Sequence, residues 1–565
     1  MKNRASEKYL GSLIALGCAF VTVFVRLSAG SDPVNVTKLF ALGGVALAVF
    51  FVAVRFASKE VWRESWSLLV IASAFLFFGF ISVLMSEAPI NEVFYGVYGR
   101  NTGFLTYFLL TMIMVSMALL RSPDSYSKLL FGLFATGITN TIYCLWVLLF
   151  GDFLPWNNQY GKILGLFGNP DFISAFLGIF TTAIVAYSLQ RGKSAFLRLA
   201  TAVISCVALY EIIRSHAIQG LVVLVGGFLL IGFFLVRSKW DSAFPSWVYS
   251  VFVAVLGFLA ILGTLQKGPL SFIYKKSVSL RGSYWHAGIE MGVNNPFFGI
   301  GFDAYGDWYR KSRPAVALID TPPPNVVSNV SHNVVIDLFA SGGFPLLISY
   351  LAILFLGAKS IIKIMSKRKE YDGIFVSLTV VWVCYQVQSI ISINQIGLAI
   401  WGWVTTGALL GYEKTITAST LITQTKLESR NIKPKLARQS VVSPQLLSGV
   451  GLVLGLLIAF PPINSDVKWR KALDSRNLQT VEDALKPSYL NPVDTSRYIQ
   501  AVQLMTDSKL PNEAFKYLQI GLEYNPNSTL LWKFLYYSPS ASEAQKSEAF
   551  QNLSRLDPLN KNPAA

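Results

Sequence analysis

The sequence predicts an all-α membrane protein: a polytopic bundle of about 13 transmembrane helices, a large extracytoplasmic loop and a C-terminal domain of helical repeats. Hydrophobic residues make up 53% of the chain and charged residues only 14%, whereas a soluble globular protein carries about 25% charged residues. The apolar residues gather in blocks of about 20 residues, the length that a helix needs to cross a hydrocarbon core of about 30 Å. After residue 463 these blocks end, and three similar proline-bearing segments recur.

The apolar blocks give thirteen candidate spans, a count that is good to within one. They are 10–29, 37–55, 67–86, 104–120, 128–150, 172–189, 199–213, 220–236, 247–265, 343–362, 374–393, 396–412 and 447–463. The basic leader MKNRASEKY resembles the start of a signal peptide. The apolar stretch behind it is longer than the roughly 7–15 residues of a cleavable signal. We therefore interpret the first span as a retained helix.

The net charge of +17 is mostly a signal of membrane topology. Residues 464–565 hold 12 Lys and Arg against 11 Asp and Glu, so the excess belongs to the membrane region, and this argues against a nucleic-acid partner. There the basic residues cluster in alternate short loops, as in Lys367, Arg368 and Lys369. By the positive-inside rule the N-terminus is cytoplasmic. The loops 87–103, 151–171 and 266–342 and the C-terminal tail are then extracytoplasmic, although one span more or fewer would move the tail.

These features divide the chain into four predicted units. They are a first part of the bundle (1–265), a large extracytoplasmic loop (266–342), a second part of the bundle (343–463) and a C-terminal tail (464–565). In the tail, YLNPVD, EYNPNS and RLDPLN place prolines 34 and 32 residues apart. Tetratricopeptide repeats have a period of about 34 residues. The tail is therefore predicted to be tetratricopeptide-like and to serve as a packing or docking module, the alternative being an irregular helical tail.

The large loop opens with an unusual run of positive charge. Residues 266–285 contain Lys275, Lys276 and Arg281 and no acidic residue. One interpretation is an anion site at the membrane surface, and an interfacial basic helix explains Lys267, Lys275 and Lys276 equally well. Arg281 differs because it begins RGSYWHAGIEMGVNNPFFGIGFDAYGDWY, which is rich in aromatic residues and glycines. An arginine in this setting can bind a phosphate group through two hydrogen bonds.

Other polar residues lie at the outer ends of predicted spans. Arg100 is flanked by glycines in YGVYGRNTGFL, and it either reaches lipid headgroups or belongs to a site that the backbone approaches closely. Asn169 lies in GLFGNPDF, where the simplest role is a helix start with Asp171 as the cap. Arg214 either pairs with Glu211 or faces the site, since a charge within a membrane costs about 2.5–3.5 kcal/mol if it is central and unpaired.

His332 is one of only three histidines, and it precedes the tenth span in SHNVVIDLFASGG. An imidazole with a pKa near 6.5 can accept a hydroxyl proton at neutral pH, although His332 taken alone is better explained as a hydrogen-bonding residue at a helix start. The chain has no HExxH, no GxxxxGK[ST] and no pair of aspartates in an outward loop. We therefore expect extracytoplasmic chemistry with no metal and no nucleotide.

In this order the segments GRNTG, GLFGNPD, RGSYWHAGIEMGVNNPFFGIGFDAY and SHN…GG resemble the O-antigen ligase/polymerase family of bacterial membrane glycosyltransferases. The resemblance covers residues 90–412 and implies an enzyme of the bacterial plasma (inner) membrane. Such an enzyme transfers a glycan from a polyprenyl diphosphate carrier to an acceptor hydroxyl, without metal or cofactor and with inversion at the anomeric carbon. The implied partners are membrane lipid, the lipid-linked oligosaccharide, an acceptor glycan, lipid or protein, and a possible protein partner of the tail.

The resemblance also implies roles for particular residues. By motif position His332 is the base, and Arg281 and Arg100 stabilise the charge that develops on the diphosphate. Asn333, Asn169 and Trp285 position groups around them, and Lys275 and Lys276 steer the donor. Many relatives carry a Ser-Arg pair where this chain has RSHAIQG, with Ile218 at the arginine position. Arg214, four residues earlier on the same helix face, is the expected substitute.

Three alternatives remain open from the sequence. A transporter or flippase for lipid-linked glycans predicts inverted repeats and ionisable residues near the middle of the membrane. A membrane-anchored repeat scaffold leaves the basic, aromatic-rich loop without a role. A cell-wall glycan polymerase of the shape-and-division type has a similar fold but matches the Arg and His pattern less well. Within the glycosyltransferase hypothesis, the motifs do not separate ligase, polymerase and protein O-oligosaccharyltransferase.

Overall fold

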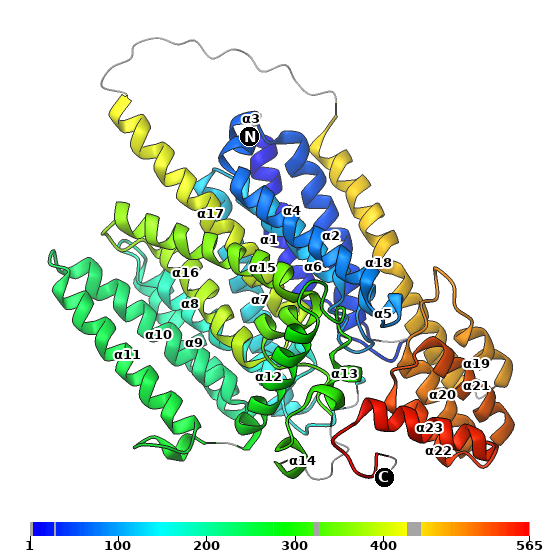
Figure 1. Cartoon of the computed structure of the whole chain (residues 1–565). Helices are drawn as coiled ribbons and strands as arrows, with labels where there is room; N and C mark the ends of the chain where they lie inside the picture. Colours follow the sequence, from blue (N-terminus) through cyan, green and yellow to red (C-terminus); the bar gives the residue numbers. More distant parts are fainter. Residues whose placement is uncertain are drawn as a thin grey trace.

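The computed structural model describes residues 4–27, 30–156, 158–274, 276–320, 327–425, 442–475 and 477–563. Within these ranges the secondary structure is helical, apart from an isolated bridge between Ser488 and Asn491. This confirms the predicted all-α fold class. Figure 1 shows a bundle of long helices with a smaller group of short helices attached at one end.

Every expected span overlaps a helix. These helices are α1 (Arg4–Val23), α2 (Asn35–Phe56), α4 (Trp66–Met85), α6 (Phe104–Ala118), α7 (Pro123–Phe150), α8 (Pro170–Ser188), α9 (Ala195–Ser215), α10 (Ile218–Lys239), α11 (Phe244–Thr264), α15 (Val334–Lys367), α16 (Gly373–Ile391), α17 (Ile396–Thr425) and α18 (Pro444–Ser475). Within the described ranges ten helices are long and apolar enough to cross a membrane, and α1, α6 and α17 are not among them. The protein is therefore a multi-pass membrane protein, and the number of thirteen spans stays a prediction.

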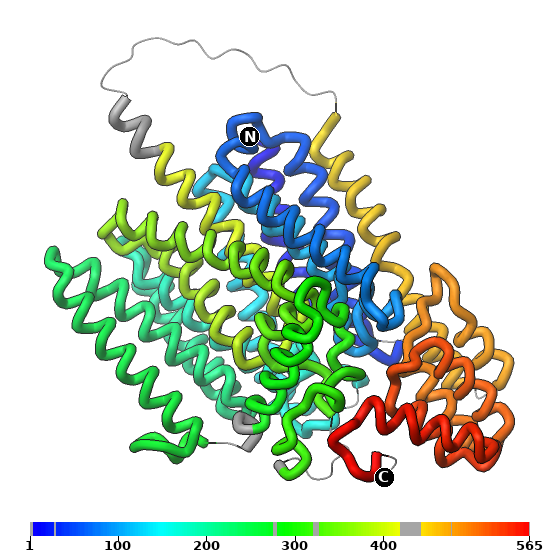
Figure 2. Tube along the Cα trace, in the orientation of Figure 1, coloured from blue at the N-terminus to red at the C-terminus, as the bar shows by residue number. Residues whose placement is uncertain are grey.

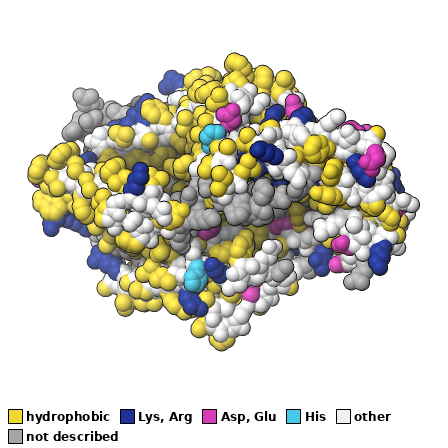
Figure 3. Space-filling model, turned by 60° about the horizontal axis from the view of Figure 1, so that its bottom comes forward, with side chains coloured by type: hydrophobic (Ala, Val, Ile, Leu, Met, Phe, Trp, Pro, Cys, Tyr) yellow, Lys and Arg dark blue, Asp and Glu magenta, His cyan; other side chains and the backbone are white. Residues whose placement is uncertain are grey.

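The surface of the bundle is apolar where a lipid-facing surface is expected. On α11 the side chains of Trp247, Phe252, Phe258 and Ile261 are each more than half exposed. Figure 3 shows the corresponding hydrophobic surface at its left edge. Exposed aliphatic and aromatic side chains on a long helix are stable in hydrocarbon rather than in water. The exposure of α11 therefore agrees with a position at the edge of the membrane bundle.

The helix α18 links the bundle to the tail. It packs along α2 through small residues, and the approach is so close that a Cβ atom on Gly455 would lie 1.9 Å from the carbonyl oxygen of Gly43. Glycines at such contacts let two membrane helices approach to backbone distance. α18 then continues to Ser475, past the predicted boundary at 463–464. The tail therefore begins as a direct extension of a helix that is fixed to the bundle.

The tail consists of short helices packed in pairs. They are α19 (Leu478–Leu485), α20 (Thr495–Asp507), α21 (Pro511–Tyr524), α22 (Thr529–Tyr537) and α23 (Glu543–Leu556). Their core includes Trp469, Tyr498, Leu531 and Leu553, all nearly inaccessible. The three prolines that mark the sequence repeat follow α19, α21 and α23. This agrees with a helix-pair repeat, and the tetratricopeptide assignment itself stays a prediction.

The two ends of the bundle differ in what they carry. Figure 1 places the N-terminus at one end, and the tail at the other end together with the short helices α12 (Lys276–Asn294), α13 (Tyr305–Ser312) and α14 (Ala317–Asp320). In Figure 2 the tail lies directly beside the loop that contains α13. An odd number of membrane crossings places the N-terminus and the tail at opposite ends of the bundle. Which end faces the cytoplasm remains the prediction made from the positive-inside rule.

Buried ion pairs fix the tail to the large loop. Asp557, which is 2% exposed, accepts hydrogen bonds from Nη2 of Arg313 at 2.6 Å to Oδ1 and 2.8 Å to Oδ2. The Nε atom of Arg310 lies 3.9 Å from the same carboxylate. In α18, Asp466 accepts hydrogen bonds from Tyr98 and Arg497 and pairs with Arg26. The tail is therefore held by charged contacts on two sides.

We expect the Asp557→Asn variant to loosen the tail. Removing one partner of a buried ion pair costs about 3–5 kcal/mol, because the other charge stays buried without compensation. Here Arg313, 3% exposed, would lose its carboxylate. Limited proteolysis in detergent should release the tail from this variant faster than from the wild type. The matched control is Asp474→Asn, since Asp474 forms an exposed pair with Arg470 and such pairs contribute about 0–1 kcal/mol. Equal cleavage of both variants would contradict the docking role of Asp557.

Candidate functional site

The site is built around a break in α15. Gly342 and Gly343 have non-helical backbone angles, and Gly343 has a φ of 64°. The break leaves carbonyl groups of the first half without partners inside the helix. Gly342 and Gly343 are the two glycines of the SHN…GG segment. They break α15 within its length and do not mark its start.

The segment from Asn295 to Gly301 fills this break. The amide groups of Ile300 and Gly301 donate to the carbonyls of Ala340 and Ser341 at 2.9 and 3.0 Å, and the amide of Phe344 donates to the carbonyl of Pro296 at 2.8 Å. At Gly299, which has a φ of 65°, a Cβ atom would lie 2.2 Å from the carbonyl carbon of Ser341. Only glycine fits this approach. The N-P and G-x-G pattern therefore locks the loop onto α15.

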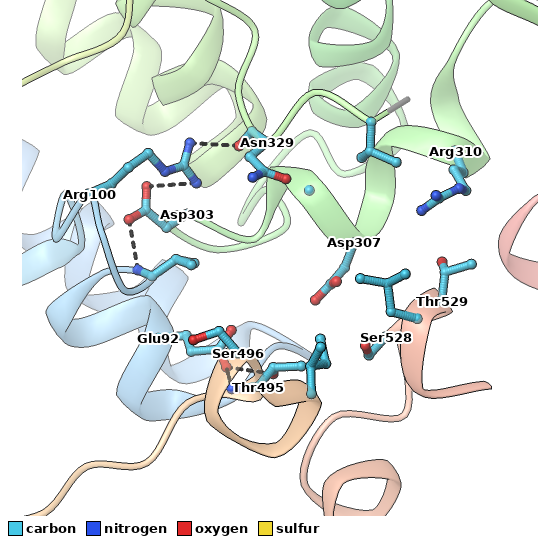
Figure 4. Close-up of a pocket in the computed structure, with 15 residues that line it drawn as sticks. Glu92, Arg100, Asp303, Asp307, Arg310, Asn329, Thr495, Ser496, Ser528 and Thr529 are labelled. Carbon is cyan, nitrogen blue, oxygen red and sulfur yellow. Dashed lines mark hydrogen bonds and ion pairs between the residues drawn. The ribbon is translucent and has the colours of Figure 1, made fainter. Parts of the chain in front are cut away.

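Asp303, two residues after this lock, organises the loop that carries Arg100. Its Oδ2 atom accepts hydrogen bonds from the amides of Val97 and Thr102 at 3.0 and 3.2 Å, and its Oδ1 atom accepts one from the Thr102 hydroxyl at 2.8 Å. Nη2 of Arg100 lies 3.8 Å from Oδ1, and Nη1 donates to the carbonyl of Asn329 at 2.8 Å (Figure 4). Arg100 is thus held by the large loop on both sides of its guanidinium group.

His332 is not the cap of α15. Asn333 takes that role, since its Oδ1 atom accepts from the amides of Val335 and Ile336 at 3.0 and 3.2 Å. Asp337 braces the turn by accepting from the amide of Ser331 at 2.7 Å. His332 itself has a φ of 58°, a conformation that is uncommon outside glycine and costs about 1–3 kcal/mol. The neighbouring residues therefore hold the backbone of His332 in this strained conformation. The side chain of His332 forms no hydrogen bond with the described residues.

The ring of His332 stacks on Tyr284 of α12, with centroids 5.6 Å apart and the planes at 29°. Burial, together with the positive charges of Arg281 and Arg100, lowers the pKa of His332 to about 4. Both arginines therefore lie near enough to act on the imidazole, although they come from segments about 180 residues apart in the chain. At neutral pH the imidazole is uncharged and can accept a proton.

Arg281 lies three residues before Tyr284 on α12, so both face the same side of that helix. Its guanidinium group forms no hydrogen bond or ion pair with the described part of the chain. Burial lowers the pKa of Arg281, while Asp171 and Tyr284 raise it. An arginine remains charged under such conditions. The site thus contains a half-buried cation whose hydrogen-bond donors are available to an anion.

Two further predicted residues lie around this group. Asn169 caps α8, because its Oδ1 atom accepts from the amide of Asp171 at 2.8 Å, and it also donates to the hydroxyl of Tyr160 at 3.3 Å. Asn169 is therefore the cap, and Asp171 lies inside the helix near Arg281. Trp285 follows Tyr284 on α12, and its Nε1 atom is buried without a hydrogen-bond acceptor among the described residues.

The remaining predicted residues are Arg214, Lys275 and Lys276. Arg214 is exposed near the end of α9 and forms no hydrogen bond or ion pair with the described residues. The ion pair between Arg214 and Glu211, one of the two alternatives from the sequence, does not form. Both carboxylate oxygens of Glu211 are buried without a partner among the described residues. Lys275 lies outside the described residues, and Lys276 begins α12.

Two contributors were missed at the sequence level. Asp303 lies two residues after the G-x-G segment, and this position next to a glycine turn was the available signal. The tail was assigned to packing or docking, yet Thr495, Ser528 and Thr529 line a cavity that also contains Arg100. No local pattern marks those hydroxyl groups.

Comparison with known proteins finds one family in the central part of the chain. Residues 176–351 match the O-antigen ligase family, and comparison with curated proteins found no match. The matched segment begins inside α8 and ends inside α15. It contains Arg281, Trp285, His332 and Asn333, while Arg100 and Asn169 precede it. The central part of the chain is thus similar to the O-antigen ligase family, within a multi-pass membrane protein.

Proposed function

We propose that this protein transfers a glycan from a polyprenyl diphosphate carrier to an acceptor hydroxyl at the extracytoplasmic face of the bacterial inner membrane, without a metal ion or cofactor. The observation that carries the proposal is the meeting of an uncharged, hydrogen-bond-free imidazole with two arginines at the end of a membrane bundle. The imidazole suits a hydroxyl proton, and the arginines suit a diphosphate. The O-antigen ligase domain supports the reaction class.

In the proposed reaction His332 accepts the proton of the acceptor hydroxyl. The oxygen then attacks the anomeric carbon of the donor glycan, and the bond from that carbon to the diphosphate oxygen breaks on the opposite face. A new glycosidic bond forms with inversion, and the diphosphate leaves with the bonding electron pair. Arg281 and Arg100 stabilise the charge that grows on the leaving oxygen. Because both arginines are already in place, little rearrangement is needed as that charge develops.

The other predicted residues take supporting roles in this proposal. Asn333 and Asn169 hold the helix starts of α15 and α8, and so they fix the positions of His332 and Asp171. Trp285 offers a buried N–H group to a bound ligand. Lys275 and Lys276, at the start of the basic loop, steer the anionic donor by charge. Arg214 remains a weaker candidate for binding, because its side chain is exposed on α9.

In the pH profile of kcat/KM, which reports the free enzyme, activity should fall on the acid side only at an unusually low pH. A general base works in its uncharged form, so a lowered pKa keeps His332 competent down to about pH 4. We expect kcat/KM to stay constant from about pH 8 to pH 6 and to fall only at lower pH. A bound diphosphate offsets the charge of Arg281 and Arg100, which raises the imidazole pKa in the complex. The limb of kcat should therefore lie at higher pH than the limb of kcat/KM, and a kcat/KM limb near the ordinary value of about 6.5 would contradict the effect of burial.

Proteoliposomes test transfer against translocation. The protein is reconstituted with a polyprenyl-diphosphate-linked oligosaccharide and candidate acceptors, and both glycan transfer and movement of the lipid between leaflets are measured. We expect transfer by the wild type and strongly reduced transfer by His332→Ala and Arg281→Ala. Lipid movement without transfer would favour the transporter hypothesis. Full transfer by both variants would reject the assigned residues.

A further inference from the structure

A cavity of about 330 Å³ lies between the bundle, the large loop and the tail (Figure 4). Arg100 and Glu92 come from the bundle side, Asp303 and Asp307 from the loop, and Thr495 from the tail. Ligand pockets in proteins occupy roughly 300–1,000 Å³. The cavity is therefore at the lower end of the size that holds a small organic molecule, such as one or two sugar rings.

Short hydrogen bonds fix the tail as a wall of this cavity. The amide and the hydroxyl of Thr495 both donate to Oε1 of Glu92 at 2.6 Å. The side-chain amide of Asn525 donates to Oδ2 of Asp307 at 2.8 Å and to the hydroxyl of Thr495 at 2.9 Å. Together with the Asp557 pair, these contacts hold the starts of α20 and α22 against the loop. The cavity is thus bordered by specific contacts between the tail and the rest of the chain.

The walls offer both hydrogen-bond donors and acceptors at close range. Hydroxyl groups of Ser496, Ser528 and Thr529 lie on the tail side, and Figure 4 shows the carboxyl group of Asp307 directed between the loop and the tail. Burial, together with the negative charges of Asp494 and Asp307, raises the pKa of Glu92 to about 8, although the hydrogen bonds from Thr495 lower it. Glu92 is therefore protonated at neutral pH, so it adds no negative charge to the cavity.

This mixture of groups favours a neutral, polyhydroxylated ligand. A phosphate would meet the carboxylates of Asp303 and Asp307, and a metal ion would meet the guanidinium groups of Arg100 and Arg310. A sugar ring carries several hydroxyl groups, each of which both donates and accepts. Side-chain hydroxyl, carboxylate and guanidinium groups together satisfy such a ligand without leaving a buried charge unpaired.

We propose that this cavity binds a saccharide unit, so that the C-terminal tail forms part of the substrate-binding site. The inference rests on the proposed function, because a glycan is both donated and received there. Arg100 connects the two places: it lines the cavity, and its charge acts on His332. A sugar in the cavity thus lies next to the group that stabilises the leaving diphosphate. The sugar belongs either to the donor glycan or to the acceptor.

Full-length protein in lipid nanodiscs gives the test. Binding of cellobiose, lactose and N,N′-diacetylchitobiose is measured by saturation-transfer NMR, and binding of inorganic pyrophosphate is measured by calorimetry. Leu530→Trp narrows the cavity, since Leu530 lines it and is 46% exposed at the start of α22. Leu478→Trp is the matched control: Leu478 is 41% exposed at the start of α19 and does not line the cavity.

We expect at least one disaccharide to bind the wild type and Leu478→Trp, and to bind Leu530→Trp at least tenfold more weakly, with pyrophosphate binding unchanged. Absence of disaccharide binding to the wild type, or equal binding to both variants, overturns the saccharide site. If the wild type does not bind pyrophosphate, the proposed function is overturned instead. Failure of the saccharide site and failure of the proposed function are therefore distinguishable. In the transfer assay, a raised KM of Leu530→Trp for the lipid-linked donor assigns the cavity to the donor glycan, and a raised KM for the acceptor assigns it to the acceptor.

Discussion

Replacement of His332 with alanine is expected to lower kcat for glycan transfer by about 10²–10⁴-fold, the usual contribution of a positioned general base. The imidazole is uncharged at neutral pH, stacks on Tyr284 and has no structural hydrogen bond among the described residues. Its removal therefore takes away a proton acceptor and no fold-determining contact. Transfer is measured in nanodiscs, and thermal unfolding of the variant should match that of the wild type.

The matched control for this variant is His286→Ala. His286 lies two residues after Tyr284 on α12, is exposed, and does not face His332. We expect it to retain wild-type transfer. A fall in both variants by the same factor would mean that α12 is sensitive to any change and would contradict a specific role of His332.

Replacement of Arg281 is expected to have the second largest effect. Removing one stabiliser of developing negative charge costs about 10²–10³-fold in kcat. The guanidinium group of Arg281 forms no hydrogen bond or ion pair with the described residues, whereas that of Arg100 is bound to Asp303 and Asn329. Arg281→Lys should recover only part of the loss, because an ammonium group cannot form the two parallel hydrogen bonds of a guanidinium group. The measurement is kcat with a saturating acceptor, together with the affinity for inorganic pyrophosphate.

Two other arginine variants serve as comparisons for Arg281. Arg470→Ala changes an exposed side chain of the tail and should leave transfer unchanged. Arg214→Ala tests whether Arg214 replaces the arginine that relatives carry near Ile218. Because Arg214 is exposed, and the charges that lower the pKa of His332 are those of Arg281 and Arg100, we expect Arg214→Ala to reduce transfer less than Arg281→Ala. A larger loss for Arg214 than for Arg281 would contradict the assignment of the diphosphate to Arg281.

Hydropathy was sufficient to predict the helices of the bundle, because a helix in lipid must be apolar along its whole length. The order of motifs was sufficient to predict that His332, Arg281 and Arg100 belong together, which the Coulomb effect of both arginines on His332 supports. The sequence left open whether His332 caps α15. The cap is Asn333, the next residue, and a one-residue difference of this kind depends on backbone angles that sequence patterns do not specify.

Long-range contacts explain most of what the sequence did not reveal. Asp303 bonds residues about 200 positions earlier, and Asp557 bonds Arg313 across 244 positions. Neither pairing leaves a periodic or local pattern. The glycines of the G-x-G segment can be seen in the sequence, but the need for glycine there cannot. Gly299 packs against the backbone of α15, where a side chain would not fit. The same limit applies to Glu211 and Arg214, whose spacing permits a pair that the fold does not form.

The central claim is that His332 activates a hydroxyl beside a diphosphate leaving group. A single-turnover reaction of the reconstituted protein with a polyprenyl-diphosphate-linked oligosaccharide measures both products at once. We predict that the wild type releases polyprenyl diphosphate and forms the glycosidic bond in equal amounts and with inversion at the anomeric carbon, and that His332→Ala forms neither at a comparable rate. Transfer with retention of configuration, or transfer at the wild-type rate by His332→Ala, would contradict the claim.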